Sequence, residues 1–584
     1  MTTGAAPRGN RLFIRKSVDQ VQREAASHHL KRSLGPVNLV LFGIGCIIGA
    51  GIYVMTGNAA ATYAGPAVML SFVVAGLACG FAGLCYAELA STMPVAGSAY
   101  TYSYTTLGEV FAWTMGWLLV LEYGVAAATV AAGWSGNVVS LLAQYGVVLP
   151  PGITTSFIQA IPDASGALIF STGHGLNLIG AGGILMVTVL LVLGVSESAN
   201  VNNVIVLIKV GVLLAFIVYG FGFINLKNYD PFIPPNQGGF TYGVPGIFRA
   251  ASVIFFAYVG FEAVSTAAAE SRNPQRDMPI GILGSLFVCT IIYMLVAAVL
   301  TGVVPFRELG VAAPIALAVD RMGIPWFAVL IKIGAIAGLT SVMLILTYGQ
   351  SRVFYSIARD GLLPKLFATI HPKFRTPWIG TIILGVAIAI AASLLPITIL
   401  GDLVSLGTAV AFAIVCLSTM WLRNQRPELV RPFRVPLGGG RLPMVAVILL
   451  STAIGLILLY AFKLLFNSEW TGWGSIVVVA LGALWLLTAR KSLQSRVWVG
   501  VVPVLGIIGA IFMAAPLLED IATKALKGDT LPAIILSSYI LVGAAIYLLY
   551  GLRHSRLAQG LDILDDGLLP TPMEAQVFGL DEKR

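Results

Sequence analysis

The stretch Gly43-Ile-Gly-Cys-Ile-Ile-Gly-Ala-Gly51-Ile-Tyr53 places four glycines inside the first long apolar run of the chain. Lipid offers the backbone no hydrogen-bond partner, so a broken membrane helix is tolerated only where the freed groups face a cavity or a ligand. The sixth apolar run is interrupted in a similar way at Phe255-Phe-Ala-Tyr-Val-Gly-Phe-Glu262. Two interruptions five runs apart are typical of a binding site formed between inverted repeats.

The composition is that of a polytopic membrane protein. Hydrophobic residues make up 58% of the 584 residues and charged residues 10%, and the mean hydropathy is +0.90. A helix needs roughly 20 apolar residues to cross a membrane. Fourteen runs satisfy this requirement, which predicts an all-α polytopic membrane protein with about 14 transmembrane helices. The runs cover residues 37–57, 66–90, 107–140, 176–194, 201–224, 245–269, 279–304, 326–356, 378–396, 401–421, 443–465, 472–489, 497–515 and 531–551.

The positive charges indicate the orientation. An even number of spans puts both termini on one side, and a cytoplasmic N-terminus places 26 of the 35 Lys and Arg residues in the cytoplasm and six outside. Cytoplasmic loops carry such an excess. We therefore predict a multi-pass protein of the cell (inner or plasma) membrane with cytoplasmic N- and C-termini. The pI of about 9.3 then reflects topology and contact with membrane lipids, and no nucleic-acid partner is expected.

The first interruption has the chemistry of an anion site. We predict Ile47, Gly49, Ala50 and Gly51 as binding residues. The side chains at 49, 50 and 51 are small or absent, and unwinding here exposes the N–H groups that begin the outer half-helix. These groups form the positive end of a helix dipole, which favours a carboxylate. The alternative is a close contact between helices, because Gly45 and Gly49 form a GxxxG pattern.

The second interruption has the complementary chemistry. We predict Phe256, Ala257, Tyr258 and Val259 as binding residues, since an unwound turn here presents carbonyl oxygens to an ammonium group. Gly260 permits a close backbone approach. The alternative is an ordinary aromatic helix with one glycine. Together, donors on one side and acceptors on the other fit a zwitterion, an α-amino acid.

Several stretches resemble the amino acid–polyamine–organocation (APC) superfamily, and within it the cationic amino acid transporter family. The resemblance runs from Leu34 to Arg434 and resumes at residues 546–555. It implies a LeuT-type five-plus-five inverted repeat, with the substrate carboxylate at the first break and the amino group at the sixth helix. The stretches are GIGCIIGAGIYVMTG (43–57), LEYGVAAATVAAGWSG (121–136), NNVIVLIK (202–209), FFAYVGFEAVSTAAAESRNPQRDMPIGI (255–282), SRVFYSIARDGLLP (351–364) and IYLLYGLRHS (546–555).

The chain divides into five parts on this basis. Residues 443–490 look like a hydrophobic pair added to the twelve-helix core of the bacterial members. The parts are a cytoplasmic tail (1–36), a first five-helix repeat (37–224), a second five-helix repeat (225–421), additional transmembrane helices (422–552) and a cytoplasmic C-terminal tail (553–584).

Lys209 is the predicted proton-coupling residue. It lies about 12 Å along the fifth run from the cytoplasmic end, where an ionisable group is costly unless it pairs or functions. In relatives that have a lysine here, it occupies the place of a sodium site and contacts the first helix, so the resemblance implies proton coupling. The alternative is a side chain that extends to the cytoplasmic interface.

Other charges in apolar runs allow two roles each. Glu122 is a candidate to hold a cationic substrate side chain, or it makes a structural hydrogen bond. Glu262 either caps freed N–H groups or responds to protons. Arg249 forms an extracellular gate or contacts lipid headgroups. Glu88 and Glu109 lie near cytoplasmic helix ends, where we expect solvated or capping roles.

We predict a permease that imports amino acids, cationic ones by preference, by alternating access with proton coupling. One alternative is a broad or neutral amino acid permease or exchanger. The other is a transport-dead amino acid sensor. We expect no enzyme activity, since no HExxH or nucleophile–base motif is present. All five cysteines lie in apolar runs, and we expect no metal or cofactor.

Overall fold

The computed structural model describes residues 11–17, 34–94, 98–162, 168–194, 199–374, 376–426, 428–436, 441–443, 453, 456, 496–498 and 501–559. Within them, nine helical segments are long and apolar enough to cross a membrane, and three shorter apolar helices accompany them. These helices coincide with twelve of the fourteen predicted runs. The remaining two runs, 443–465 and 472–489, lie outside the described residues apart from positions 443, 453 and 456.

Among the described membrane helices, the first and the sixth are discontinuous and the others are continuous. The first consists of α2 (Pro36–Ile47) and an outer half from η2 (Gly51–Met55) through α3 (Thr56–Ala59) to η3 (Ala60–Ala64); the sixth consists of α11 (Gly243–Ile254), η7 (Phe255–Tyr258) and η8 (Phe261–Glu270). The other helices are α4 (Val68–Thr92), α6 (Glu109–Leu119) with η5 (Val120–Val125) and α7 (Ala126–Gln144), α9 (Leu178–Val192), α10 (Ala199–Phe221), α12 (Pro274–Val303), α14 (Pro325–Arg359), α15 (Trp378–Leu394), α16 (Ile397–Gln425), α19 (Val501–Leu526) and α20 (Leu531–Ile546).

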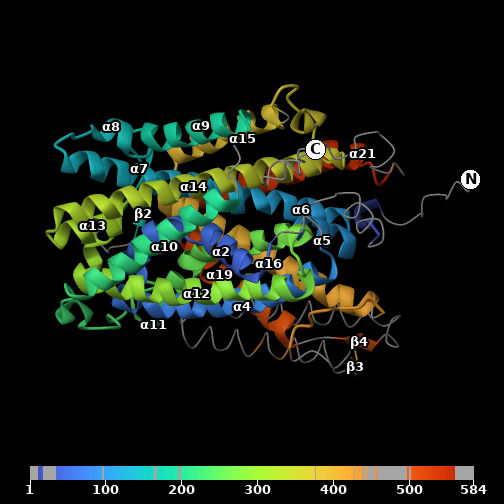
Figure 1. Cartoon of the computed structure of the whole chain (residues 1–584), viewed down its shortest axis with the longest axis horizontal. Helices are drawn as coiled ribbons and strands as arrows, with labels where there is room; N and C mark the ends of the chain where they lie inside the picture. The colour runs from blue at the N-terminus through green and yellow to red at the C-terminus, as the bar shows by residue number, and fades with distance from the viewer. Residues whose placement is uncertain are drawn as a thin grey trace, which may run out of the picture.

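The helices run along one long axis and pack in two groups. In Figure 1, α7, α9, α14 and α15 lie together at the top, while α4, α11 and α12 lie together below them. The short helices α8 (Pro151–Thr154) and α13 (Pro314–Arg321) mark one end of the molecule, and α5 (Ser98–Thr106) and α21 (Leu552–His554) mark the other. We call the α5 and α21 end the inner side, because the charges predict that it faces the cytoplasm.

The described part of the loop 141–175 lies at the outer side, which α8 marks. It contains α8 and a hairpin in which β1 (Ile158–Pro162) pairs antiparallel with β2 (Leu168–Thr172). The hairpin is tied to the helices, since the Phe170 N–H donates to Asp529 at 3.2 Å.

Local backbone geometry explains both breaks. After α2, Ile48 adopts an extended conformation with φ −70° and ψ 98°, which ends the hydrogen-bonding pattern of the helix. In the sixth helix, Val259 is extended and Gly260 has φ +119°, a conformation that only glycine adopts at little cost. The helix resumes at Phe261 as a 3₁₀ helix, so the segments on both sides of the break, 255–258 and 261–270, are more tightly wound than an α-helix.

Candidate substrate site at the two helix breaks

The two breaks contact each other through their backbones. A Cβ atom added to Gly51 would lie 2.2 Å from the Cα of Ala257, and one added to Gly260 would lie 2.7 Å from the carbonyl carbon of Cys46. No real Cβ atom approaches another atom so closely. These glycines are therefore required because two chain segments, more than two hundred positions apart, meet without an intervening side chain. Gly49 instead faces Val342 of α14, 3.1 Å from its Cβ position.

Tyr293 of α12 joins the two breaks. Its hydroxyl lies 2.8 Å from the carbonyl oxygen of Ile47 and 3.2 Å from that of Ala257, so one donor is shared between the last residue of α2 and the turn of the sixth helix. The ring is fully buried. The sequence analysis missed this residue, because a single tyrosine in an apolar run carries no recognisable pattern.

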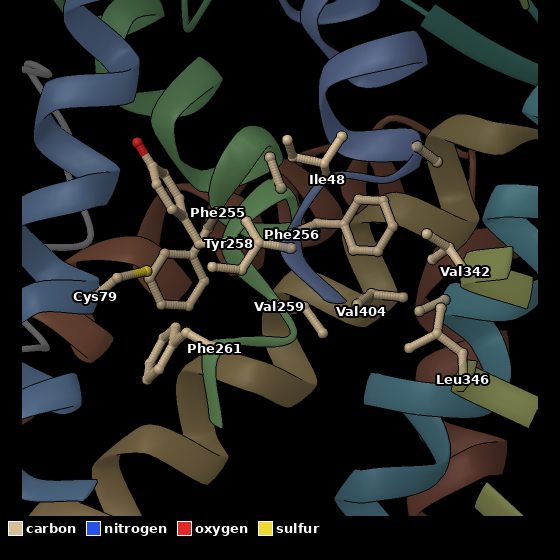
Figure 2. Packing of buried hydrophobic residues seen from close by; sticks show 14 of the residues in the cluster. Ile48, Cys79, Phe255, Phe256, Tyr258, Val259, Phe261, Val342, Leu346 and Val404 are labelled. Carbon is tan, nitrogen blue, oxygen red and sulfur yellow. The ribbon is translucent and has the colours of Figure 1, made fainter. Parts of the chain in front are cut away.

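Side chains around the breaks form an apolar wall. Figure 2 shows Phe256 reaching from the sixth helix toward Val342 and Leu346 of α14, with Ile48 and Val404 nearby. All five are buried. A ligand side chain that points from the breaks toward α14 would therefore meet hydrocarbon.

Tyr258 lies on the other side of the sixth helix. Its hydroxyl donates to the carbonyl oxygen of Phe72 in α4 at 2.8 Å, and its side chain groups with Phe255, Phe261 and Cys79 in Figure 2. Its side chain thus packs against α4 rather than against the apolar wall. The carbonyl of Phe256 accepts the Val259 N–H at 3.1 Å, which closes the tight turn.

Lys209 contacts the first helix just before its break. Its Nζ donates to the carbonyl oxygen of Gly45 at 3.0 Å, and its side chain packs against Gly338 of α14. With 1% of its surface exposed, it does not extend to the interface. A cation here lies at the negative end of the α2 dipole, where it is stabilised.

Two buried carboxyl groups lie on the inner side of the break. Glu262 accepts the Gly260 N–H at 2.8 Å, so it caps the resumed helix. Glu122 in η5 is 0% exposed, and neither of its oxygens has a hydrogen-bond partner among the described residues. The two carboxyl groups lie close enough to interact electrostatically. A partly satisfied pair in the protein interior is costly unless a cation or a proton joins it.

Arg249 belongs to a buried network near the outer side. Its guanidinium donates to Asp402 at 2.9 and 3.2 Å and to Asp520 at 3.0 Å, and it stacks over Tyr63, 4.8 Å from the ring centre. Lys524 joins the same network through Asp520. Because Arg249 is 0% exposed, the alternative of a lipid-headgroup contact is wrong. The network ties the outer halves of the two broken helices to α16 and α19.

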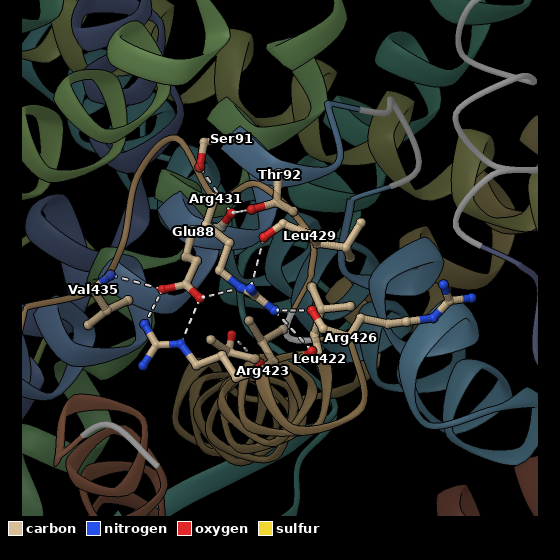
Figure 3. Close-up of polar contacts among 11 residues, drawn as sticks. Glu88, Ser91, Thr92, Leu422, Arg423, Arg426, Leu429, Arg431 and Val435 are labelled. Carbon is tan, nitrogen blue, oxygen red and sulfur yellow. Dashed lines mark hydrogen bonds and ion pairs between the residues drawn. The ribbon is translucent and has the colours of Figure 1, made fainter. Parts of the chain in front are cut away.

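The expectation that Glu88 and Glu109 are solvated is also wrong, since both are buried. Glu88 forms a two-pronged ion pair with Arg423 of α16, lies 3.6 Å from the Nε of Arg431 and accepts the Val435 N–H (Figure 3). Hydropathy alone cannot show that these arginines, more than 330 positions away, fold back onto α4.

Comparisons with known proteins agree with this arrangement. A family described as "Amino acid permease" matches residues 34–481. The methylthioribose transporter of Bacillus subtilis is 41% identical over 82% of this chain and 98% of its own length. A branched-chain amino acid permease of the same organism is 41% identical over 82% of this chain and 95% of its own length.

A plant relative matches less of its own length. Cationic amino acid transporter 4, vacuolar, of Arabidopsis thaliana is 37% identical, over 72% of this chain and 68% of its own length. The family match covers more than half of the chain, and the bacterial relatives align along almost their full length. This chain, whose first and sixth helices are broken where they meet, is therefore a member of the amino acid permease family of the APC superfamily.

Proposed function

We propose that this permease imports amino acids across the cell membrane by alternating access, coupled to protons. The observation that carries the proposal is the backbone contact between the two breaks at Gly51 and Ala257. This contact brings the N-terminal end of the outer half-helix, which is the positive end of its dipole, beside the tight turn of the sixth helix, deep within the protein. Together, this helix end and this turn fit the carboxylate and ammonium groups of one α-amino acid.

The proposed coupling site is Lys209, with Glu262 as a second candidate. The ammonium group of Lys209 bridges α10 to the carbonyl of Gly45. Loss of its proton would weaken its attraction to the negative end of α2 and free the inner half of the first helix to move. With both termini in the cytoplasm, the inner half of the first helix faces the cytoplasm and would act as the gate on that side.

Glu122 supports a preference for cationic amino acids. It is a buried carboxylate near the break without a hydrogen-bond partner among the described residues, and a lysine or arginine side chain would supply the missing charge. A specific observation also favours neutral amino acids: the wall formed by Phe256, Val342 and Leu346 is apolar, and one relative is named a branched-chain permease. Cationic preference is the proposal, and the neutral class is the second candidate.

Uptake into proteoliposomes tests these proposals together. The purified protein is reconstituted, and uptake of radiolabelled arginine, lysine, leucine and alanine is measured with and without an inward proton gradient, against protein-free liposomes. We expect gradient-stimulated uptake of arginine and lysine. Uptake of leucine alone would select the neutral class. Gradient-independent uptake that requires amino acid inside the liposome would indicate an exchanger, and binding without flux would indicate a sensor.

A further inference from the structure

A segment before the first membrane helix is anchored on the inner side. The carbonyl of Ile14 accepts the N–H of Glu109 at the start of α6, 2.9 Å away. Arg15 stacks over Trp421 of α16, 4.4 Å from the ring centre, and the backbone of Phe13 packs against Gly108. Residues 11–17 therefore contact the inner ends of two helices that are distant from them in the sequence.

The strongest anchor is Lys16. It is 8% exposed, and its Nζ forms an ion pair with Asp360 at the end of α14, 2.8 Å away. The same carboxylate accepts a hydrogen bond from Tyr100 of α5 at 2.7 Å. The carbonyl of Asp360 also accepts the N–H of Arg556, which follows the last helix. Asp360 thus connects the N-terminal segment, α5, α14 and the chain beyond α21.

Two further contacts hold the inner ends of the broken helices. Leu34, two residues before α2, pairs with Ser271 at the end of the sixth helix, and its carbonyl accepts the Arg272 N–H at 2.9 Å. In α5, which contacts Asp360 through Tyr100, the Ser98 hydroxyl lies 2.8 Å from the Ser265 hydroxyl of η8. The inner half of the sixth helix is therefore held from two directions.

We propose that residues 11–17 form an N-terminal latch that keeps the inner side closed. While Lys16 holds Asp360, α5 and α14 meet at the same carboxylate, and α5 restrains the inner half of the sixth helix through Ser98 and Ser265. Release of the latch allows this inner half to swing away and open the site to the inner side. The inference rests on the proposed alternating access, and it makes the latch a control on how often the site opens inward.

Thiol accessibility tests the latch in the full-length protein. All five native cysteines are buried, so a Ser265→Cys substitution supplies a reporter at the contact that must part. Labelling by a membrane-impermeant maleimide, applied from the inner side, is compared among four forms: Ser265→Cys alone, the same with Lys16→Gln, with residues 1–17 removed, and with residues 1–10 removed. The last is the matched control, because it shortens the tail but retains every described latch residue.

We expect Lys16→Gln and removal of 1–17 to raise the labelling rate about fivefold or more, the lower end of typical conformational couplings. Removal of 1–10 should leave it unchanged. Equal rates in all four forms would overturn the proposal, as would equal acceleration by both truncations. If the longer truncation fails to fold, Lys16→Gln decides alone. Labelling does not require transport, so a wild-type protein that takes up no amino acid would refute the proposed function separately.

Discussion

The close contact between Gly51 and Ala257 predicts that one methyl group added at position 51 disturbs the binding site. In Gly51→Ala, the added Cβ would lie 2.2 Å from the Cα of Ala257 and 2.3 Å from its Cβ. Ordinary contact begins near 3.4 Å, so the two breaks must separate by about 1.2 Å to restore it. Backbone atoms cannot rotate away as a flexible side chain would, so the strain displaces the two helix breaks that form the site.

The magnitude follows from two effects. Overpacking of this kind costs about 1–3 kcal/mol. A separation of 1.2 Å would also stretch the 3.2 Å contact between Tyr293 and the Ala257 carbonyl beyond hydrogen-bond range, a loss of about 0.5–1.5 kcal/mol. If the protein accommodates the methyl by parting the breaks, the combined cost lowers substrate affinity by roughly 10- to 1,000-fold, at 1.4 kcal/mol for each factor of ten.

The assay is equilibrium binding of the transported amino acid to purified protein, with uptake measured in parallel. Gly182→Ala is the matched control. It makes the same substitution inside α9, where a Cβ would have no neighbour within 4 Å. We expect wild-type affinity for the control. Wild-type affinity in Gly51→Ala as well would refute the reasoning, because it would show that separating the breaks leaves the binding site intact.

Three further predictions concern other residues. Lys209→Ala should abolish the stimulation of uptake by a proton gradient, because the group that holds the inner half of the first helix is gone; unchanged pH dependence of uptake would remove Lys209 from coupling. Tyr293→Phe should raise the uptake KM, since two buried carbonyls lose a shared donor worth about 1–3 kcal/mol, whereas Tyr258→Phe should not; equal effects in both would contradict a role at the breaks. Glu88→Ala should destabilise the protein by about 3–5 kcal/mol, because it removes the carboxylate that pairs with two buried arginines. Glu308→Ala, which removes the exposed ion pair with Arg321, should cost no more than about 1 kcal/mol. Equal losses of Tm in detergent for Glu88→Ala and Glu308→Ala would show that the buried network around Glu88 contributes no more than an exposed pair.

The positions of the helices could be predicted because they depend on local properties. A membrane helix satisfies its own backbone, so the length and hydropathy of each run suffice to locate it. The same holds for the breaks: glycines at 49 and 51 and at 260 weaken a helix wherever it lies. The twelve predicted runs within the described residues all became helices, and both breaks lie where the sequence indicated.

The partners of polar residues could not be predicted, because they depend on segments distant in the chain. The sequence placed Glu88 near a helix end, where exposure to water is usual. The fold instead brings Arg423 and Arg431 onto it. Arg249 likewise finds Asp402 and Asp520 only after α16 and α19 have packed beside the sixth helix.

The sequence by itself determined that this protein spans a membrane many times and that its first and sixth helices are broken, since both follow from hydropathy and backbone freedom along a short stretch. Only the tertiary structure decided that Gly51 meets Ala257, that Tyr293 joins both breaks and that Lys209 holds Gly45. The physical reason is that a contact between remote residues depends on the relative placement of whole helices. That placement is set by packing summed over many side chains, which no local pattern encodes.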